Sequence, residues 1–191
     1  MSIIVVGGTP GTGKTEVARE LGSILSKRVV SLGELAREAG CITEYDEERD
    51  SGVIDEDCLV EAIMDLLDTY KDEDLIIEGH YVDLVPASKV RMAFILRTHP
   101  ETLRERLRER EYPQAKIREN VEAEVVGVCQ MDAIEVFGEE LVVEVDTTGL
   151  SPKDVARNIL QSLESPTAPR RIDWMEMLEK EGRLDDFLEP M

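Results

Sequence analysis

Residues 8–15, GTPGTGKT, restrict the possible folds more than any other stretch of this chain. The apolar run IIVV precedes them at residues 3–6, and EVARELGSIL follows them at residues 16–25. Three glycines and a proline within eight residues suit neither a strand nor a helix. The pattern therefore predicts a buried strand, a tight bend and an amphipathic helix in direct succession.

Within the bend, Gly8, Gly13, Lys14 and Thr15 match the pattern G-x-x-x-x-G-K-[ST]. Glycines let successive backbone N–H groups converge on an anion, and the following helix points its positive end at the same place. Lys14 can then reach the outer phosphates, and the hydroxyl of Thr15 can bind Mg²⁺. A chance glycine turn is the alternative, but the strand, the helix, the lysine and the threonine together favour a phosphate-binding loop.

Short apolar runs recur along the chain and alternate with segments of helical spacing. Strands are expected at residues 3–6, 28–32, 74–78, 92–96 and 140–145. Helices are expected at residues 17–25, at 59–67 with Asp55 as N-cap, from Pro100 through Leu107, from Ile117 through Ile134, and from Ser151 through Leu163. The alternation predicts an α/β fold of stacked β-α-β units with helices on both faces of a parallel sheet.

The composition changes after Leu163. SPTAPRR, at residues 165–171, reads as a linker, and the short amphipathic piece with Trp174, Met177 and Leu178 follows it. We expect this tail to fold back on the main domain.

The chain has 191 residues and a formal net charge of −20. The length suits one main domain with small appendages. An acidic surface of this kind disfavours binding of polyanions, so no direct sequence-specific DNA binding is expected. The acidity is compatible with a basic partner, a salt-rich cytoplasm or merely a soluble, self-repelling surface.

Cys41, Cys58 and Cys129 are widely spaced, without a C-x-x-C pair. This spacing predicts reduced, packed thiols rather than a zinc or redox site. No apolar stretch is long enough for the core of a signal peptide or for a membrane span. We therefore expect a cytoplasmic protein without membrane contact.

Two further positions carry chemistry near the expected phosphate loop. Glu78 closes the run LIIE, so its carboxylate should emerge at the carboxyl edge of the sheet, where ligands bind, and help to hold a metal ion. His80 follows two residues later. A turn or core histidine is the alternative for His80, and its spacing from Glu78 favours a functional role.

Arginines supply the second candidate anion site. Arg37 lies in LGELAREAG after the second expected strand, either within reach of the ligand edge or as a solvated helix residue. In LRERLRERE, Arg106 and Arg110 are one helical turn apart, as are Arg104 and Arg108. One pair can face phosphates while the other pairs with nearby glutamates, which favours a lid over a purely solvated helix face.

Six separated segments, in order, resemble the adenylate kinase isoenzyme six family, small kinases also implicated in assembly of the small ribosomal subunit. They are GTPGTGKT, LGELARE, YDEERD with IDEDCLVEAI, IIEGH, FILRT, and RLRER with KIREN. The resemblance covers about residues 1–163. It implies a P-loop fold of the nucleoside monophosphate kinase type with a five-stranded parallel sheet. The main domain would span residues 1–164, with a monophosphate-binding arm at about 31–54, a short lid at about 109–119 and a tail at 165–191.

The resemblance also implies roles for individual residues. The ATP phosphates would be lined by Gly11, Thr12, Gly13, Lys14, Thr15 and Glu16, with Arg110 reaching ATP from the lid. Arg37 would hold the monophosphate, Thr15 and Glu78 would hold Mg²⁺, and Lys14, Arg110, His80 and Glu78 would form the catalytic group. The loop around Thr148 and Gly149 would lie near adenine.

Two positions depart from the family pattern. Glu78 stands where the family usually has Asp, so the longer side chain rearranges its contact with the metal or its water. Glu111 stands where the family commonly has Gly, which removes the easy helix stop that glycine gives.

The phosphate-loop residues and the resemblance together suggest two functions. The first is a broad-specificity nucleoside monophosphate kinase that converts ATP and AMP to two ADP, with ATPase activity. The second is mainly an ATPase that assists assembly of the pre-ribosomal small subunit and its rRNA. The resemblance implies that this factor binds the basic ribosomal protein of the S-eleven family.

Overall fold

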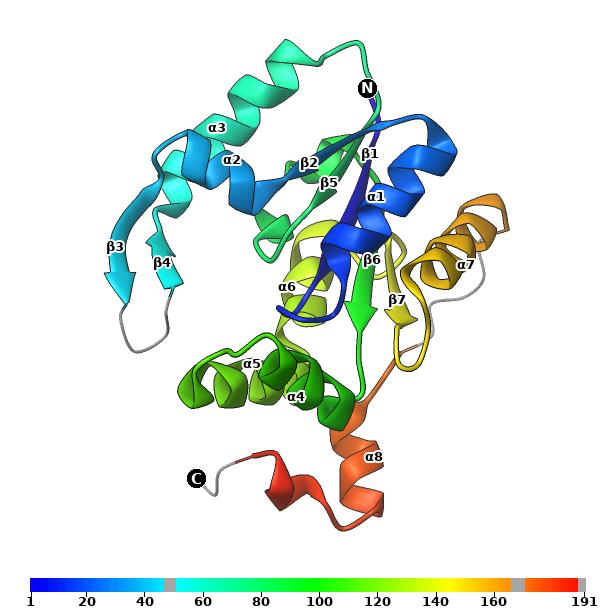
Figure 1. The fold of residues 1–191 in the computed structure, drawn as a ribbon. Coiled ribbons are helices and arrows are strands. Elements are labelled where there is room, and N and C mark those ends of the chain that lie inside the picture. The colour runs from blue at the N-terminus through cyan, green and yellow to red at the C-terminus, as the bar shows by residue number, and fades with distance from the viewer. Residues whose placement is uncertain (47–50, 166–170, 189–191) are drawn as a thin grey trace.

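The computed structural model describes residues 1–46, 51–165 and 171–188, and Figure 1 shows its ribbon. The strands are β1 (Ile3–Gly8), β2 (Arg28–Ser31), β3 (Ile42–Asp46), β4 (Ser51–Ile54), β5 (Leu75–Glu78), β6 (Val90–Arg97) and β7 (Val142–Asp146). The helices are α1 (Lys14–Leu25), α2 (Leu32–Glu38), α3 (Glu56–Thr69), α4 (Pro100–Glu109), α5 (Gln114–Val126), α6 (Val128–Phe137), α7 (Pro152–Glu164) and α8 (Trp174–Lys180). Short 3-10 turns cover Val82–Leu84, Ala87–Lys89 and Leu184–Asp186.

Five strands form one parallel sheet in the order β2-β5-β1-β6-β7. The central strand β1 is buried along its whole length, as its continuous apolar run predicts. In the register of the sheet, Val6 lies opposite both Glu78 and Phe94. The carboxyl ends of β1, β5 and β6 therefore meet at one edge, and the loops that follow them converge there.

Helices cover both faces of the sheet and confirm the predicted three-layer α/β fold (Figure 1). Helices α1 and α7 pack on one face, where Val17, Leu21 and Ile159 contact the strands. Helices α2, α3 and α6 pack on the other face. The predicted caps are present: the side chains of Asp55 and Ser151 accept hydrogen bonds from backbone N–H groups in the first turns of α3 and α7.

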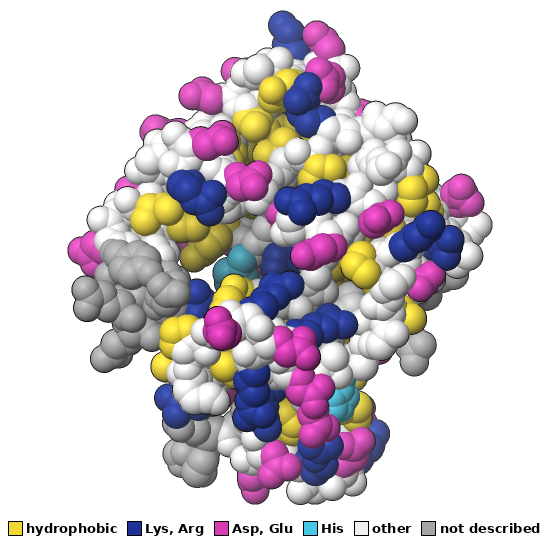
Figure 2. All heavy atoms as spheres, in the orientation of Figure 1, with side chains coloured by type: hydrophobic (Ala, Val, Ile, Leu, Met, Phe, Trp, Pro, Cys, Tyr) yellow, Lys and Arg dark blue, Asp and Glu magenta, His cyan; other side chains and the backbone are white. Residues whose placement is uncertain are grey.

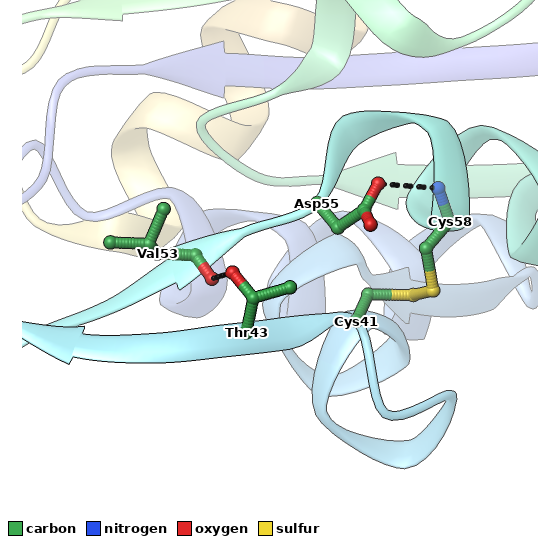
Figure 3. Close-up of a disulfide and its surroundings, with 5 residues drawn as sticks. All are labelled: Cys41, Thr43, Val53, Asp55 and Cys58. Atoms are coloured by element: carbon green, nitrogen blue, oxygen red, sulfur yellow. Dashed lines mark hydrogen bonds between the residues drawn. A yellow bond between two sulfur atoms is a disulfide. The ribbon is translucent and has the colours of Figure 1, made fainter.

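The hairpin of β3 and β4 projects beside the main sheet, and its strands were not expected from the sequence. Residues 47–50 of the expected arm lie outside the described residues. The expectation that all three cysteines are reduced is wrong, because a disulfide joins Cys41 to Cys58 at the base of the hairpin (Figure 3). Their Cα atoms are 5.5 Å apart although 17 residues separate them in the chain. The pairing depends on the fold of the hairpin, which their spacing does not reveal.

One expected helix is divided in two. The apolar positions from Ile117 to Ile134 predict a single helix, but Gly127, with a φ of 81°, ends α5 and starts α6. A residue in the left-handed region cannot continue an α-helix, so the chain changes direction there.

The tail folds back on the domain as predicted. Its helix α8 lies against α5, and Leu178 and Phe187 join a buried cluster with leucines of α4. Most of the expected linker lies outside the described residues, since only residues 165 and 171 of it are described. Within the part of the chain that is described, none of the helices combines the length and hydropathy needed to cross a membrane.

Candidate active site

The phosphate loop follows β1 directly. Gly8, Gly11 and Gly13 have φ values of 138°, 95° and 94°, in the left-handed region that glycine tolerates. The carbonyl oxygen of Thr9 accepts hydrogen bonds from the Thr12 amide at 3.2 Å and the Thr12 hydroxyl at 2.9 Å. These bonds close the bend, and Gly13 leads directly into helix α1. The loop therefore has the conformation that a phosphate-binding nest requires.

Lys14 points back over this loop. Its Nζ donates to the carbonyl oxygen of Thr9 at 3.1 Å. Burial lowers the pKa of Lys14, while the nearby Cys129, Glu78 and Glu124 act in the opposite direction. A partly buried ammonium group whose hydrogen-bond acceptor is a neutral carbonyl oxygen gains a stronger partner when a phosphate binds.

Thr15 and Glu78 come together at the edge of the sheet. The Thr15 hydroxyl donates to Oε1 of Glu78 at 3.2 Å, although 63 residues separate them. Glu78 is only 3% exposed because β5 lies directly beside β1. A hydroxyl and a carboxylate side by side are hard oxygen donors of the kind that Mg²⁺ prefers.

His80 is an exposed residue whose ring lies close to Cys129, which the sequence did not assign to the site. Its Nδ1 is 3.4 Å from Sγ of Cys129, and the same sulfur is 3.9 Å from the Thr9 hydroxyl. Partial burial and the charge of Lys14 both lower the pKa of His80, which favours the neutral imidazole. Burial raises the pKa of Cys129 to about 11, so its thiol stays protonated at neutral pH.

The paired arginines of α4 divide between two surfaces. Arg106 and Arg110 line a cavity of about 230 Å³ together with Gly11, Thr12 and Gly13. Arg110 is 4.0 Å from the Glu16 carboxylate, which is a weak contact between exposed side chains.

Arg104 faces the C-terminal tail instead of the cavity. It does not pair with the glutamates of its own helix as expected, but donates to the backbone oxygen of Asp186 at 2.6 Å and lies over the ring of Phe187.

The far wall of the cavity comes from the loop after β7. Arg106 donates to the hydroxyl and the carbonyl oxygen of Thr147, at 3.3 and 3.1 Å. Leu150, Pro152 and Val155 complete the wall with apolar surface. An apolar slot next to a phosphate loop has the character of a pocket for a nucleotide base.

Arg37 stands apart from this group. It lies in the last turn of α2 and is exposed. No hydrogen bond or ion pair within residues 1–46, 51–165 and 171–188 joins it to the phosphate loop. Figure 2 shows Lys and Arg side chains gathered around a hollow near the centre of one face, with one of the two histidines at its border.

Sequence reasoning did not single out Arg106 from the neighbouring arginines, and it expected Cys129 only as a packed thiol, not as part of the site. It did not point to Thr147 or Glu124. Glu124, on α5, is 1% exposed and accepts the Thr9 hydroxyl at 2.6 Å. A glutamate among the apolar positions of a helix is the one signal that could have found it, because a buried carboxylate needs donors.

Comparison with known proteins places the chain in a family. The AAA domain family matches residues 4–127. A protein of Pyrococcus furiosus named "Putative adenylate kinase" is 38% identical over 180 residues, covering 93% of this chain and 94% of that protein. A protein of Methanothermobacter thermautotrophicus with the same name is 43% identical over 157 residues, covering 81% and 85%. The chain belongs to this adenylate-kinase-like family.

Solved structures agree with an α/β P-loop kinase fold. A sugar kinase from Janibacter sp. superimposes with a TM-score of 0.60 at 16% identity, over 90% of this chain and 99% of that one. Shikimate kinase from Acinetobacter baumannii gives a TM-score of 0.54 at 17% identity, over 86% and 94%. At these identities the likeness extends to the fold alone.

Proposed function

We propose that the protein transfers the γ-phosphoryl group of ATP to AMP or a related nucleoside monophosphate, reversibly. One observation carries this proposal: Lys14, the Thr15–Glu78 pair, Arg106 and Arg110 surround a single glycine-rich loop. Relatives named adenylate kinase, matched over most of their length, favour a nucleotide as the acceptor rather than a sugar or shikimate.

The phosphate loop and the lid would each bind the phosphates of ATP, from different sides. Backbone amides of Gly11, Thr12 and Gly13 would hold the phosphates, with Lys14 reaching the transferred group. Residues 109–119 would form the lid, whose Arg110 would meet two phosphate oxygens with its planar fork. Arg110 is exposed and 4.0 Å from Glu16, so only weak contact holds it away from an anion.

The monophosphate would bind on the other side of the loop. We assign its phosphate to Arg37 and its binding arm to residues 31–54. The support is that Arg37 is exposed on α2, between the ligand edge of β2 and the hairpin of β3 and β4. Closure of this arm would align donor and acceptor, and alignment of reactants lowers a barrier by roughly 7–11 kcal/mol, more than one charged hydrogen bond contributes.

Mg²⁺ fits the pair of Thr15 and Glu78. Both side chains end in oxygen, and their 3.2 Å contact brings them to one spot at the edge of the sheet. A bound Mg²⁺ would neutralise charge on the phosphates. The chain's own part is to present the Thr15 hydroxyl and to keep the longer Glu78 side chain buried behind it.

ATP hydrolysis is the second activity that we propose for this site. His80 would orient a water molecule toward the transferred phosphoryl group. The support is the lowered pKa of His80, which leaves a ring nitrogen able to accept a hydrogen bond at neutral pH.

Product stoichiometry tests the reaction. Purified protein with Mg·ATP and AMP should yield two ADP for each AMP consumed, measured by ion-exchange chromatography. ADP and free phosphate formed at the same rate with or without AMP would instead identify an ATPase. UMP and CMP in place of AMP would measure how broad the acceptor specificity is.

We also propose a role in late maturation of the small ribosomal subunit and its rRNA, with a basic protein of the S-eleven family as partner. The net charge of −20 supports this, because an acidic surface can hold an arginine-rich segment until RNA replaces it. A pull-down with that ribosomal protein, with and without ATP and across a salt series, tests the role. Failure to bind at any salt concentration would remove it.

A further inference from the structure

Glu124 is the centre of a buried network that reaches the phosphate loop. Its Oε1 accepts hydrogen bonds from Nε of Arg97 at 2.9 Å, the Thr98 amide at 2.9 Å and the indole Nε1 of Trp174 at 3.1 Å. Its Oε2 accepts the hydroxyl of Thr9 at 2.6 Å. Four donors on one carboxylate leave it little freedom to rotate.

Thr9 connects the fixed carboxylate of Glu124 to the phosphate loop and to Lys14. Its hydroxyl donates a hydrogen bond to Glu124. Its carbonyl oxygen accepts hydrogen bonds from the Thr12 hydroxyl and from Nζ of Lys14. The orientation of one peptide group therefore fixes the closed bend and the resting position of the lysine. Any shift of Glu124 moves the carbonyl on which Lys14 rests.

Trp174 brings the C-terminal tail into the same network. The side chain is 7% exposed and comes from the first residue of α8, 50 residues after Glu124. The segment just before it is also held, because the backbone oxygen of Ile172 accepts from Arg97 at 3.1 Å and its amide donates to Glu144 at 3.2 Å.

The remainder of the tail is packed on the α4 and α5 side of the loop. Leu178 is fully buried and Phe187 is 4% exposed, in a cluster with Leu103, Leu107, Ile117, Val121 and Val125. The same Leu103 and Leu107 approach Gly11 so closely that a Cβ there would lie 2.7 and 2.9 Å from their methyl groups. The tail and the phosphate loop thus lie on opposite sides of one pair of leucines.

We propose that Glu124 is a positioning residue of the phosphate loop and that the tail, residues 171–188, holds it in place through the indole N–H of Trp174. The inference deepens the proposed function and rests on it for its catalytic meaning. The tail therefore completes the nucleotide site without touching the nucleotide. Loss of the indole N–H leaves Oε1 with two donors, Arg97 and Thr98, instead of three. The carboxylate can then shift, which weakens the hydrogen bond between Oε2 and Thr9 and lets the bend open.

Amide hydrogen exchange without nucleotide tests the link directly. The Thr12 amide is the probe, because it donates to the Thr9 carbonyl. Trp174→Phe removes the indole N–H but keeps a ring in place, and it should speed exchange of this amide about tenfold. Phe187→Leu is the matched control, since it loosens the tail without contacting Glu124, and it should leave the Thr12 amide within about twofold of wild type. Equal effects of the two variants on Thr12 would overturn the proposal.

A double-mutant cycle separates positioning from general loosening. Thr9→Val keeps the shape of the side chain but lacks the hydroxyl, and it leaves the tail untouched. It should speed exchange of the Thr12 amide as Trp174→Phe does, and the double variant should be no faster than either single variant. Effects that multiply in the double variant would show that Trp174 acts independently of Thr9 and would overturn the proposal.

Binding of ATP adds a functional readout. By calorimetry, the dissociation constant for Mg·ATP should rise about fivefold in Trp174→Phe and by less than about twofold when that change is added to Thr9→Val. Unchanged affinity in Trp174→Phe would overturn the tail's role. Wild-type protein that binds no ATP would overturn the proposed function, whereas the exchange result in the absence of nucleotide would stand.

Discussion

Lys14 has only a backbone carbonyl oxygen as its hydrogen-bond acceptor within the described residues, at 3.1 Å. Phosphates that bind in the loop would replace that weak acceptor with a charged one. Lys14 would therefore contribute most of its stabilisation only when nucleotide is bound. Removal of one such donor from an active site costs about 10²- to 10³-fold in turnover.

We therefore predict that Lys14→Ala lowers the rate of phosphoryl transfer by at least about a hundredfold while the fold is retained. Lys180→Ala is the control, because it removes the same charge from an exposed i,i+4 pair on α8. Steady-state rates and circular dichroism of both variants are the measurements. An active Lys14→Ala variant would show that the loop does not carry the chemistry.

Cys129 gives a prediction about pH. Burial raises its pKa to about 11 in the folded protein, against 9.0 without the fold. The unfolded chain therefore ionises first, and stability is lost as the pH rises from about 9 to about 11, by up to about 2–3 kcal/mol. Urea unfolding at pH 8 and pH 10 should show a fall in stability that is smaller in Cys129→Ala. Equal falls in both proteins would contradict the assignment, since the other titrating groups are common to both.

Residues of the candidate site differ in how far the sequence revealed them. Lys14, Thr15 and Glu78 were predictable because each stands at a strand end or helix start, and the sheet brings such ends together. Glu124 and Thr147 were not, because their roles come from which helix face and which loop pack against the phosphate loop. A glutamate among the apolar positions of a helix marks Glu124 as a buried carboxylate, but which donors it meets depends on tertiary packing that no local pattern encodes.

At the scale of elements, the end of α4 shows how a helix stop forms without glycine. Glu111 takes a φ of 56°, so a non-glycine residue occupies the left-handed position that ends the helix. Its amide donates to the carbonyl of Arg108, and that of Tyr112 donates to Leu107, as in a glycine-terminated helix. The helix stop is thus preserved at a conformational cost of about 1–2 kcal/mol.

Glu111→Gly should relieve this cost and raise the free energy of unfolding by about 0.5–1 kcal/mol, after subtraction of the extra entropy that glycine has in the unfolded chain. Glu105→Gly, at an exposed position inside the same helix, should lower it by about 1 kcal/mol. Urea titrations of both variants measure the contrast. Destabilisation by both changes would contradict the strain at residue 111.

The hairpin of β3 and β4 depends on the disulfide beneath it. Cys41 and Cys58 close a segment with a separation of 17 residues, and closure of a loop of that length stabilises a fold by about 3 kcal/mol through the unfolded state. Reduction with dithiothreitol should lower the stability of wild type by about this amount and leave a Cys41→Ser/Cys58→Ser protein unchanged. Without reductant, a thiol titration of denatured wild type should count one free thiol per chain, which is that of Cys129. Three thiols would show that the bond is absent.

Elements with strong periodicity were predictable, and the exceptions have local causes. The five strands of the parallel sheet follow their apolar runs closely. The expected helix from Ile117 to Ile134 is interrupted at Gly127, whose backbone freedom outweighs the continuous apolar stripe. The strands β3 and β4 were missed because residues 42–54 are mostly polar, so no buried face marks them.

For the whole molecule, the net charge of −20 decides how salt acts on stability. Salt weakens surface ion pairs such as Lys27–Asp74 and Arg28–Glu73, but each exposed pair contributes only about 0–1 kcal/mol. It also screens the repulsion among 42 acidic residues that face only 22 basic ones. Because the acidic residues are nearly twice as numerous, most carboxylates repel more than they attract, and the screening of repulsion should prevail.

The melting temperature should therefore rise by about 3 °C between low salt and about 0.5 M KCl, which corresponds to about 1 kcal/mol for a chain of this size. Differential scanning calorimetry at pH 7.5 measures the rise. At about pH 5 the gain should shrink, because protonation of carboxylates removes part of the repulsion before salt can screen it. A melting temperature that falls with KCl at pH 7.5 would mean that ion pairs stabilise this fold more than its excess charge destabilises it.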